Sequence, residues 1–522
     1  MPAPNPADLD HALPAVAPGA WTLAASEPER TALIVPGEAP VSYGSLAAAA
    51  NRVSNALLRL GVGTGDVVAS LQHNGPRHFE VLLATSQVGV YFVPVNVHLT
   101  PAEIAYIVAD SGAKVLVASS DLARSLADVA GGLPERRYVT GEPVPGWAPF
   151  EDLTAGAADA LPPARVNGWW MGYTSGTTGR PKGVRRPVID LEPEMVIAAG
   201  TGYLGGFGLV PGPGVHLVCS PLYHAAPCHF SLQALHLGHA IVIHRKFDAE
   251  AVLADIERYQ VTSTQMVPTH LHRMLRLPAD VRAKYDLRSI EVMLVAGAPF
   301  PPEEKRAAIE WLGPVVWEYL AATEGMVCRC SPAEALAHPG TVGRPEAVRL
   351  LGEDGAEVPP GEAGTIYFPT QVPFEYLNDP GKTGAAVRPD GWATVGDIGR
   401  LDGDGYLYLL DRRVDLIISG GVNIYPAEIE QRLVSHPAVA DVAVVGVPHP
   451  DWGHQPVAIV ALEDGWAGGP DLAARLDAHC RDGLASLKCP ARYEFREALP
   501  RTASGKLLRR VLREELAARK AP

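Results

Sequence analysis

Apolar residues recur along the first 320 positions with two alternating spacings, one that predicts amphipathic helices and one that predicts buried strands. At residues 45–60 they recur every three or four positions and Gly61 follows, which predicts a capped helix with a glycine stop. The other helices predicted in this part span 77–88, a segment opened by Pro101, and 248–259 with Asp248 as its cap. Short apolar runs that predict buried strands lie at 67–70, 91–96, 114–119, 215–220, 240–244, 261–267, 291–297 and 315–320. Strands that alternate with helices predict a largely parallel, three-layer α/β body.

A different pattern begins near residue 340. From there to about 411 the predicted strands are short and separated by glycines, as at 364–368 and 405–410, which indicates a small β subdomain. After residue 412 the pattern resets to a compact α+β unit. Its predicted elements are a helix at 427–434, strands at 440–447 and 456–462, and a helix at 471–487. We therefore predict a large N-terminal domain over residues 1–411, a connecting segment at 412–415 and a small domain over residues 416–522.

The charge of the chain narrows the classes of partner. Lys and Arg number 44 against 58 Asp and Glu in 522 residues, a net charge of −14. Such an acidic chain is a poor candidate for binding nucleic acid or an anionic membrane, although a local basic site for a phosphate is compatible with it. No run reaches about 18 uninterrupted apolar residues, and the N-terminus lacks the pattern of a signal peptide. We therefore expect no membrane span and a cytoplasmic location.

The six cysteines are too few to form a disulfide framework in a chain of this length. Cys328 and Cys330 form the only close pair, and no second pair lies at a spacing typical of zinc sites. We expect reduced thiols rather than a metal site at these positions.

Residues 173–183 carry the strongest chemical signal, Tyr-Thr-Ser-Gly-Thr-Thr-Gly-Arg-Pro-Lys-Gly. Glycines allow the backbone N–H groups to converge on an anion, the hydroxyls donate further hydrogen bonds, and Lys182 supplies positive charge. The alternative is a flexible surface turn rich in Ser, Thr and Gly. The order Pro-Lys-Gly excludes the P-loop, which requires Gly-Lys-Ser/Thr. The composition favours a phosphate-binding loop of another kind.

Four further motifs follow in order. They are Ala-Ala-Thr-Glu-Gly at 321–325, Gly-Trp-Ala-Thr-Val-Gly-Asp at 391–397, Ile-Ile-Ser-Gly-Gly-Val-Asn-Ile-Tyr-Pro-Ala-Glu-Ile-Glu at 417–430 and Pro-Arg-Thr-Ala-Ser-Gly-Lys at 500–506. In all five motifs, from about residue 20 to 515, the chain resembles the adenylate-forming enzymes: acyl-CoA synthetases, firefly-type luciferases and peptide-synthetase adenylation domains. The resemblance implies a two-step reaction. A carboxylate first attacks the α-phosphate of ATP, and a thiol then attacks the acyl adenylate.

The resemblance also implies roles in the first step, where negative charge on the phosphoryl group must be stabilised. Residues implied to bind the leaving phosphates are Thr174, Ser175, Gly176, Thr177, Thr178, Gly179 and Lys182. Glu324 is implied to bind Mg²⁺, and Asp397 and Arg412 to hold the ribose. The adenine is implied to contact Gly297, Ala298 and Pro299 and the segment Leu320, Ala321, Ala322 and Thr323. The implied catalytic residues are Lys506, His224, Glu324 and Thr178, with Lys506 bridging the carboxylate and the α-phosphate.

For the second step the family rotates its small domain about a short hinge, which corresponds to residues 413–415. Many relatives have Asp or Lys where this chain has Val414, so the usual polar hinge residue is absent. Gly420 and Gly421 are implied to line a narrow channel for the pantetheine arm of CoA. A second departure is Leu320, which stands where relatives commonly place an aromatic residue against adenine, with Tyr319 beside it.

The identity of the acid is the weakest part of the sequence signal. His224 matches the family residue between the nucleotide and the acyl pocket, and small residues follow it at 225–228. Amino-acid-activating relatives place an aspartate in this region, and none is present between residues 220 and 245. An apolar pocket would also reject an ammonium group because of its desolvation cost. We expect an apolar acid: an aryl, alicyclic or polycyclic carboxylate, or a medium to long fatty acid.

The expected activity is that of an AMP-forming acyl-CoA synthetase, with ATP, Mg²⁺, CoA and a small carboxylic acid as ligands. One alternative is a ligase that loads a carrier protein. The other is a non-catalytic acyl or nucleotide sensor, against which Lys182, Glu324, Asp397 and Lys506 argue. The oligomeric state is left open, a homodimer among the alternatives.

Overall fold

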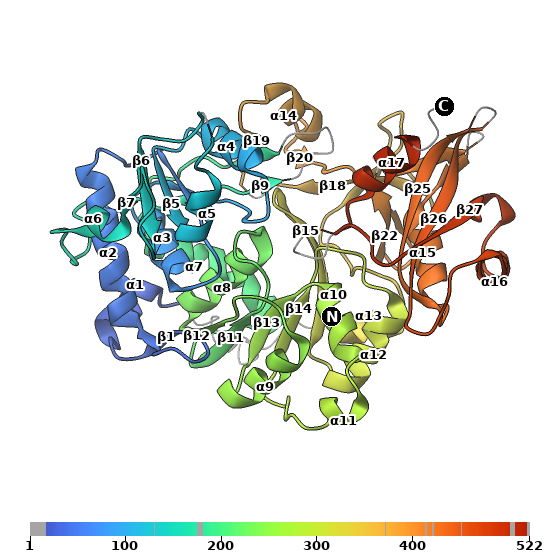
Figure 1. Ribbon diagram of the computed structural model, residues 1–522, viewed down its shortest axis with the longest axis horizontal. Helices are drawn as coiled ribbons and strands as arrows, with labels where there is room; N and C mark the ends of the chain where they lie inside the picture. Colours follow the sequence, from blue (N-terminus) through green and yellow to red (C-terminus); the bar gives the residue numbers. More distant parts are fainter. Residues whose placement is uncertain are drawn as a thin grey trace, which may run out of the picture.

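A computed structural model gives the fold of residues 17–129, 131–174, 181–370, 372–412, 415–419, 422–449, 452–501 and 507–518. Figure 1 shows a larger body, coloured blue to yellow, beside a smaller orange and red domain formed by the C-terminal part of the chain. This is the mixed α/β architecture with a large N-terminal and a small C-terminal domain that the sequence predicts.

The larger body contains two sheets that are mostly parallel. The first has eight strands in the order β16-β15-β14-β13-β11-β12-β1-β2. In that order they span Gly325–Cys330, Val316–Ala322, Val292–Val295, Ser263–Met266, Gly214–Val218, His239–Ile243, Thr31–Ile34 and Val41–Ser42. The second has six parallel strands in the order β7-β6-β5-β3-β4-β8. They span Ala148–Pro149, Arg136–Thr140, Val115–Ser119, Val67–Leu71, Tyr91–Pro94 and Trp169–Trp170.

Helices cover both faces of each sheet, which gives five layers rather than the three predicted. The layer between the sheets holds α1 (Ala20–Ser26), α2 (Tyr43–Arg59), α3 (Pro76–Ser86), α6 (Phe150–Thr154), α7 (Pro193–Thr201), the 3₁₀ helix η2 (Gly202–Phe207) and α8 (Ala225–Leu237). The outer face of the first sheet is covered by α9 (Ala249–Tyr259), α10 (Pro268–Leu275), α12 (Pro302–Leu312) and α13 (Pro332–Ala337), with α11 (Ala279–Arg282) beside α9. The outer face of the second is covered by α4 (Pro101–Asp110) and α5 (Ser120–Ser125). Periodicity predicts strands but not how they divide between sheets, which is why the number of layers was wrong.

Two smaller sheets lie beside this body. A three-stranded sheet joins β9 (Tyr173–Thr174), β10 (Lys182–Arg185) and β19 (Glu375–Tyr376), with α14 (Pro380–Ala386) following it. A five-stranded antiparallel sheet corresponds to the predicted β subdomain. It contains β17 (Arg349–Leu351), β18 (Ala363–Pro369), β20 (Trp392–Ala393), β21 (Asp397–Leu401) and β22 (Leu407–Arg412).

The small domain has a sheet of its own. Its strands are β23 (Ile417–Ser419), β24 (Val422–Ile424), β25 (Val439–His449), β26 (Gly453–Leu462) and β27 (Arg492–Arg496). Its helices are α15 (Pro426–Val434), α16 (Pro470–Arg481), the 3₁₀ helix η3 (Ser486–Lys488) and α17 (Arg509–Ala518). The predicted connecting segment at 412–415 begins with the last residue of β22 and ends before β23, and residues 413 and 414 lie outside the described residues.

Two helix ends differ from the prediction for local reasons. α2 begins at Tyr43 rather than at residue 45, because the Ser42 hydroxyl accepts the backbone N–H of Ser45 at 3.2 Å and caps the helix. α16 ends at Arg481, six residues before the predicted end at 487, and Gly483, a poor helix former, follows two residues later.

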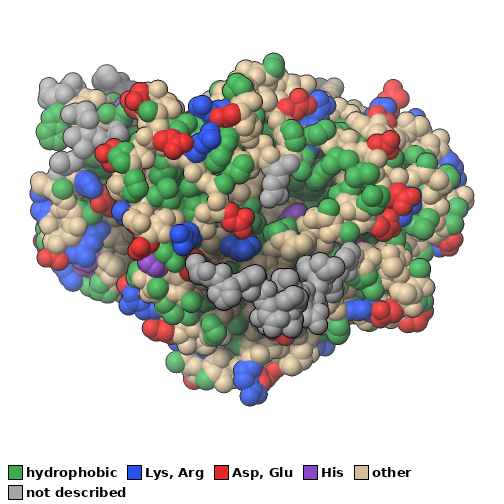
Figure 2. Space-filling view, turned by 180° about the vertical axis from the view of Figure 1, so that it is seen from behind, with side chains coloured by type: hydrophobic (Ala, Val, Ile, Leu, Met, Phe, Trp, Pro, Cys, Tyr) green, Lys and Arg blue, Asp and Glu red, His purple; other side chains and the backbone are tan. Residues whose placement is uncertain are grey.

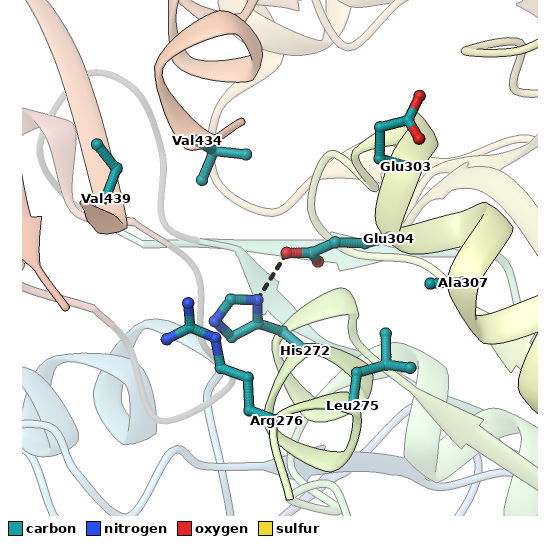
Figure 3. A pocket seen from close by; sticks show the side chains of 8 residues that line it. All are labelled: His272, Leu275, Arg276, Glu303, Glu304, Ala307, Val434 and Val439. Atoms are coloured by element: carbon teal, nitrogen blue, oxygen red, sulfur yellow. Dashed lines mark hydrogen bonds and ion pairs between the residues drawn. The ribbon is translucent and has the colours of Figure 1, made fainter. Parts of the chain in front are cut away.

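Contacts between the two domains fix their relative placement in this structure. The Asp411 carboxylate, at the end of β22, accepts the backbone N–H of Ala427 in the first turn of α15 at 3.1 Å. Arg276, just after α10, forms an ion pair with Glu463 of the small domain. Figure 3 shows the groove beside this pair, where Val434 and Val439 of the small domain face the side chains of α10 and α12.

All six cysteines lie in described parts of the chain, and all are buried free thiols, as expected. Within the described ranges no helix has both the length and the apolar character needed to cross a bilayer. The same ranges contain no group of three or more His, Cys, Asp or Glu side chains that could hold a metal ion.

Candidate active site

Three of the predicted site segments leave the same edge of the eight-stranded sheet. Parallel strands β11, β14 and β15 lead into the segment before His224, the loop 297–299 and the turn 323–324, respectively. Ligands of open α/β sheets bind at this carboxyl edge of the strands. Gly297 turns the chain there with a φ of 93°, a left-handed angle that glycine adopts without strain.

Glu324 lies in the tight turn between β15 and β16, and its side chain is buried. The Tyr376 hydroxyl donates a hydrogen bond to Glu324 Oε1 at 2.6 Å, which fixes the carboxylate. Arg186 holds the turn itself: its guanidinium donates to the backbone carbonyls of Thr323 at 3.2 Å and Glu324 at 2.7 Å. Burial lowers the pKa of Arg186, whereas the nearby Glu324 charge raises it. The turn is therefore held by two residues that the sequence motifs did not indicate.

Lys182 opens β10 and pairs in register with Thr174 of β9, so both residues flank the loop 175–180. Its ammonium lies 3.0 Å from the carboxylate of Asp379, the N-cap of α14. The hydrogen bond from Lys182 to Asp379 raises the pKa of the lysine. The pKa of Asp379 is lowered by the backbone N–H of Lys382 and then by Lys182. Lys182 is therefore charged and held at the base of the predicted phosphate loop.

Asp397 and Arg412, both predicted to hold the ribose, are brought together by the small β subdomain. Asp397 begins β21 and is buried, and it pairs directly with Arg412 at the end of β22. Only the backbone of Arg412 is described here. The register alone thus places the two predicted ribose residues side by side.

His224 is the N-cap of α8, which lies between the two large sheets. The segment before His224 is held by Asn74, another residue that no motif indicated. The Asn74 amide donates to the carbonyls of Ser220 at 3.0 Å and His244 at 2.9 Å, and its oxygen accepts the N–H of Leu222 at 2.8 Å. Asn74 therefore fixes the segment that leads into α8, of which His224 is the N-cap.

Leu320 and Tyr319 face opposite sides of β15. Tyr319 is buried in the core between the large sheets, with its ring 5.3 Å from that of Phe230 and 6.1 Å from that of Phe207. Leu320 instead packs toward the β subdomain. Tyr319 cannot replace the missing aromatic contact to adenine without leaving the core, so apolar contact from Leu320 remains the interpretation.

Part of the predicted site lies outside the described residues. This part comprises Ser175, Gly176, Thr177, Thr178, Gly179, Gly420, Gly421 and Lys506. Figure 2 shows a hollow in the middle of one face of the molecule, where Lys, Arg, Asp, Glu and His side chains gather.

Two protein-family models match this chain. Residues 21–372 match the AMP-binding enzyme family, and residues 428–506 match the AMP-binding enzyme C-terminal domain. A feruloyl-CoA synthase from Amycolatopsis sp is 36% identical over 94% of this chain and 97% of its own length. A fatty acid–[acyl-carrier-protein] ligase, ScoC, from Streptomyces coeruleorubidus is 32% identical over 94% of both chains.

A solved relative has the same fold along nearly its whole length. The o-succinylbenzoate CoA synthetase MenE from Bacillus subtilis, in complex with its acyl-adenylate intermediate, superimposes with a TM-score of 0.79 at 30% identity. The superposition covers 94% of this chain and 97% of MenE. The chain belongs to the AMP-binding enzyme family, the adenylate-forming superfamily that its motifs indicated, in the acyl-CoA synthetase branch.

Proposed function

We propose that the protein is an AMP-forming acyl-CoA synthetase, which activates a carboxylic acid as its acyl adenylate and transfers the acyl group to CoA. The observation that carries the proposal is the turn at Glu324. A buried carboxylate, which accepts a hydrogen bond from Tyr376, lies at the carboxyl edge of the large sheet, in the motif that the family uses for the nucleotide. Arg186 holds the backbone of the same turn.

In the first step these residues would bind and orient ATP. Lys182 supplies positive charge for the leaving phosphates, and a phosphate would compete with Asp379 for its ammonium. Asp397 accepts hydrogen bonds from the ribose hydroxyls. Lys506 bridges the attacking carboxylate and the α-phosphate, so that the charge developing there is stabilised.

The Glu324 site fits Mg²⁺, which proteins usually hold through one or two carboxylates together with substrate phosphates. The Glu324 carboxylate, oriented by Tyr376, offers one such oxygen ligand. Tyr376 itself pairs with Val184 of β10, the strand that Lys182 opens. When bound, the ion would neutralise charge on the phosphates. The protein's part is to orient the carboxylate through Tyr376.

CoA is the proposed acceptor because the chain matches acyl-CoA synthetases over nearly their whole length. The relative ScoC, at slightly lower identity, is named as a carrier-protein ligase and supports the alternative acceptor. The acid is proposed to be apolar at the carbon next to the carboxylate, since Ala225 and Ala226 follow His224 and no carboxylate is present there to pair with an ammonium.

The decisive experiment is ATP–pyrophosphate exchange across a panel of carboxylic acids, followed by thioester formation with CoA and with a carrier protein that bears a free phosphopantetheine thiol as competing acceptors. Exchange with at least one acid and transfer to free CoA are expected. Lys506→Ala should reduce exchange by orders of magnitude and leave CoA attack on supplied acyl adenylate nearly intact. Exchange near the wild-type rate in that variant would reject the role of Lys506, and transfer to the carrier protein alone would favour the alternative.

A further inference from the structure

Lys382, in the first turn of α14, is a cation beside the candidate site that no sequence motif indicated. Its side chain is half-buried, and its ammonium lies over the ring of Tyr376, 4.4 Å from the ring centroid. The hydroxyl of the same ring donates to Glu324 Oε1 at 2.6 Å. One tyrosine therefore contacts the lysine through its face and the proposed Mg²⁺ ligand through its hydroxyl.

The antiparallel pairing of β19 with β10 brings the start of α14 to Lys182. The backbone N–H of Leu377, just after β19, donates to the carbonyl of Gly183 at 2.8 Å. From there the chain continues in the direction opposite to β10, which leads Asp379 to Lys182. The ion pair between them, at 3.0 Å, joins α14 to the base of the predicted phosphate loop.

Two hydrogen bonds fold the first turn of α14 back onto β19. The Asp379 carboxylate, as the N-cap, accepts the backbone N–H of Lys382 at 3.0 Å. The Thr383 hydroxyl accepts the backbone N–H of Tyr376 at 2.9 Å. Figure 1 shows α14 next to β19. The place of Lys382 above the Tyr376 ring is therefore set by the backbones of both elements and not by its flexible side chain alone.

The Lys382 ammonium has no acceptor within the described parts of the chain. No carboxylate there forms an ion pair with it and no group there accepts a hydrogen bond from it, whereas Lys182 has Asp379. Burial lowers the pKa of Lys382, and the charges of Glu324 and Asp379 oppose this effect. An ammonium that loses hydration without gaining an acceptor is destabilised, so an added anion would find a favourable partner here.

The charged groups that act on Lys382 all belong to the candidate site. They are Glu324, Asp379 and Lys182, the last of which lowers its pKa further. An anion that meets both ammonium groups must carry several negative oxygens. The β- and γ-phosphates of ATP have this character, and lysine is a common partner of phosphate oxygens. The single phosphate of AMP or of an acyl adenylate offers less charge.

We infer that Lys382 contacts the leaving pyrophosphate of ATP, as a second cation beside Lys182. The inference rests on the proposed acid-activating function and adds a substrate-binding residue to it. In the first step a carboxylate oxygen bonds to the α-phosphorus. The bond from that phosphorus to the oxygen bridging to the β-phosphate breaks, and its electron pair leaves with the pyrophosphate. A cation on the β- or γ-phosphate oxygens stabilises the charge that develops there.

The test compares ATP with AMP, which lacks the β- and γ-phosphates. Isothermal titration calorimetry measures the Kd of each nucleotide at saturating Mg²⁺ without any acid. Lys382→Met keeps an unbranched apolar side chain and removes the charge. It should raise the Kd of ATP by about tenfold or more, the size of a charge-assisted hydrogen bond, and change that of AMP by less than about twofold. Lys382→Arg should keep the Kd of ATP within about threefold of wild type.

Kinetics with an acid that the wild type activates provide a second readout. In the formation of ATP from supplied acyl adenylate and pyrophosphate, Lys382→Met should raise the KM for pyrophosphate by about tenfold or more. Attack of CoA on the same adenylate should stay within about twofold of wild type, because pyrophosphate has left before that step. Arg388→Met is the matched control. It removes a cation that lies over the Tyr367 ring at 5.7 Å, later in the same segment, and should change neither value.

The outcomes distinguish this inference from the proposed function. A wild-type protein that binds no ATP would reject both. Selective loss of ATP affinity in Lys382→Met, together with no exchange by the wild type for any acid, would reject the synthetase activity and keep the contact with the β- and γ-phosphates. An unchanged Kd for ATP in Lys382→Met, an equal loss for ATP and AMP, or the same selective loss in Arg388→Met would overturn the inference and leave the function standing.

Discussion

Tyr376 acts on the candidate metal ligand from 52 positions further along the chain. Its hydroxyl donates to Glu324 Oε1 at 2.6 Å, and its ring lies under the ammonium of Lys382 at 4.4 Å. Residues that orient a metal ligand commonly change metal affinity by about 10- to 100-fold when they are substituted. A conservative substitution of Tyr376 should therefore alter the candidate Mg²⁺ site, because it removes the hydroxyl that orients the Glu324 carboxylate.

Tyr376→Phe should raise the Mg²⁺ concentration that half-saturates pyrophosphate exchange by about tenfold or more, because the Glu324 carboxylate loses its orienting donor. The measurement is a Mg²⁺ titration of exchange at saturating ATP and acid. Tyr408→Phe is the matched control, since it removes a hydroxyl that donates to Asp402 at 3.1 Å in the same region of the fold. An unchanged or tighter Mg²⁺ dependence in Tyr376→Phe would contradict the role given to Tyr376.

Motifs indicated some residues of the candidate site and not others, for a physical reason. Lys182, Glu324 and Asp397 lie in short segments whose composition is itself the signal. Arg186 and Tyr376 reach the site only through contacts with residues 138 and 52 positions away. The residues next to Arg186 and Tyr376 in the sequence give no sign of these contacts, so sequence patterns could not have identified either residue.

At the scale of elements, a buried ion pair joins α12 to β15, the strand next to the edge of the eight-stranded sheet. Lys305 and Glu318 are both almost inaccessible and form an ion pair, and Lys305 also donates to the carbonyl of Thr341 at 3.0 Å. Burial raises the pKa of Glu318, while Lys305 lowers it. Removing one partner would leave the other charge buried, which typically costs about 3–5 kcal/mol.

Glu318→Leu should lower the melting temperature of the protein by at least about 5 °C, because it leaves the Lys305 ammonium without its carboxylate. The double variant Lys305→Met/Glu318→Leu should regain most of that loss, since no charge stays buried. Thermal unfolding followed by circular dichroism provides the measurement. Arg52→Met, which breaks the exposed pair with Asp159, is the control and should shift melting by less than about 2 °C. A double variant no more stable than Glu318→Leu would be inconsistent with this account.

The sequence predicted the elements of the core better than those of the edges. Each of the eight predicted apolar runs before residue 321 is a strand, because a buried strand requires such a run. β6 (Arg136–Thr140) was missed since most of its residues are polar, and only Val139 is buried. β16 was missed as well, and it pairs antiparallel at the edge of an otherwise largely parallel sheet. Which strands share a sheet depends on tertiary contacts that no local pattern contains.

At the scale of the whole molecule, the end of the proposed hinge belongs to the small domain. Asp415 forms ion pairs with Arg509 at 3.8 Å and Arg513 at 3.4 Å, both on α17. Arg509 also pairs with Glu430 of α15 at 2.6 Å. Asp415 is thereby held by α17, which Arg509 in turn joins to α15. A rotation of the small domain would therefore place its backbone changes before residue 415.

The contact between Arg276 and Glu463 bears on that rotation. It joins α10 of the large domain to the end of β26 of the small domain, beside the groove lined by Val434 and Val439 (Figure 3). His272 and Glu304, 2.6 Å apart in the same groove, belong to the large domain alone and would stay together. Arg276–Glu463 is thus a contact that any large rotation of the small domain must break.

Arg276→Glu should therefore disfavour the present placement of the small domain, because it sets two carboxylates against each other. If the two half-reactions use different placements, as the resemblance implies, the ratio of adenylation rate to thioester-forming rate should change by about three- to tenfold, the scale of a partly exposed charge pair. Pyrophosphate exchange and the reaction of supplied acyl adenylate with CoA measure the two rates separately. The reversed pair Arg276→Glu/Glu463→Arg should restore the ratio to within about twofold of wild type, and 0.5 M salt should weaken both effects. Equal loss of both rates in Arg276→Glu, or no recovery in the reversed pair, would mean that the contact does not bias the placement of the small domain.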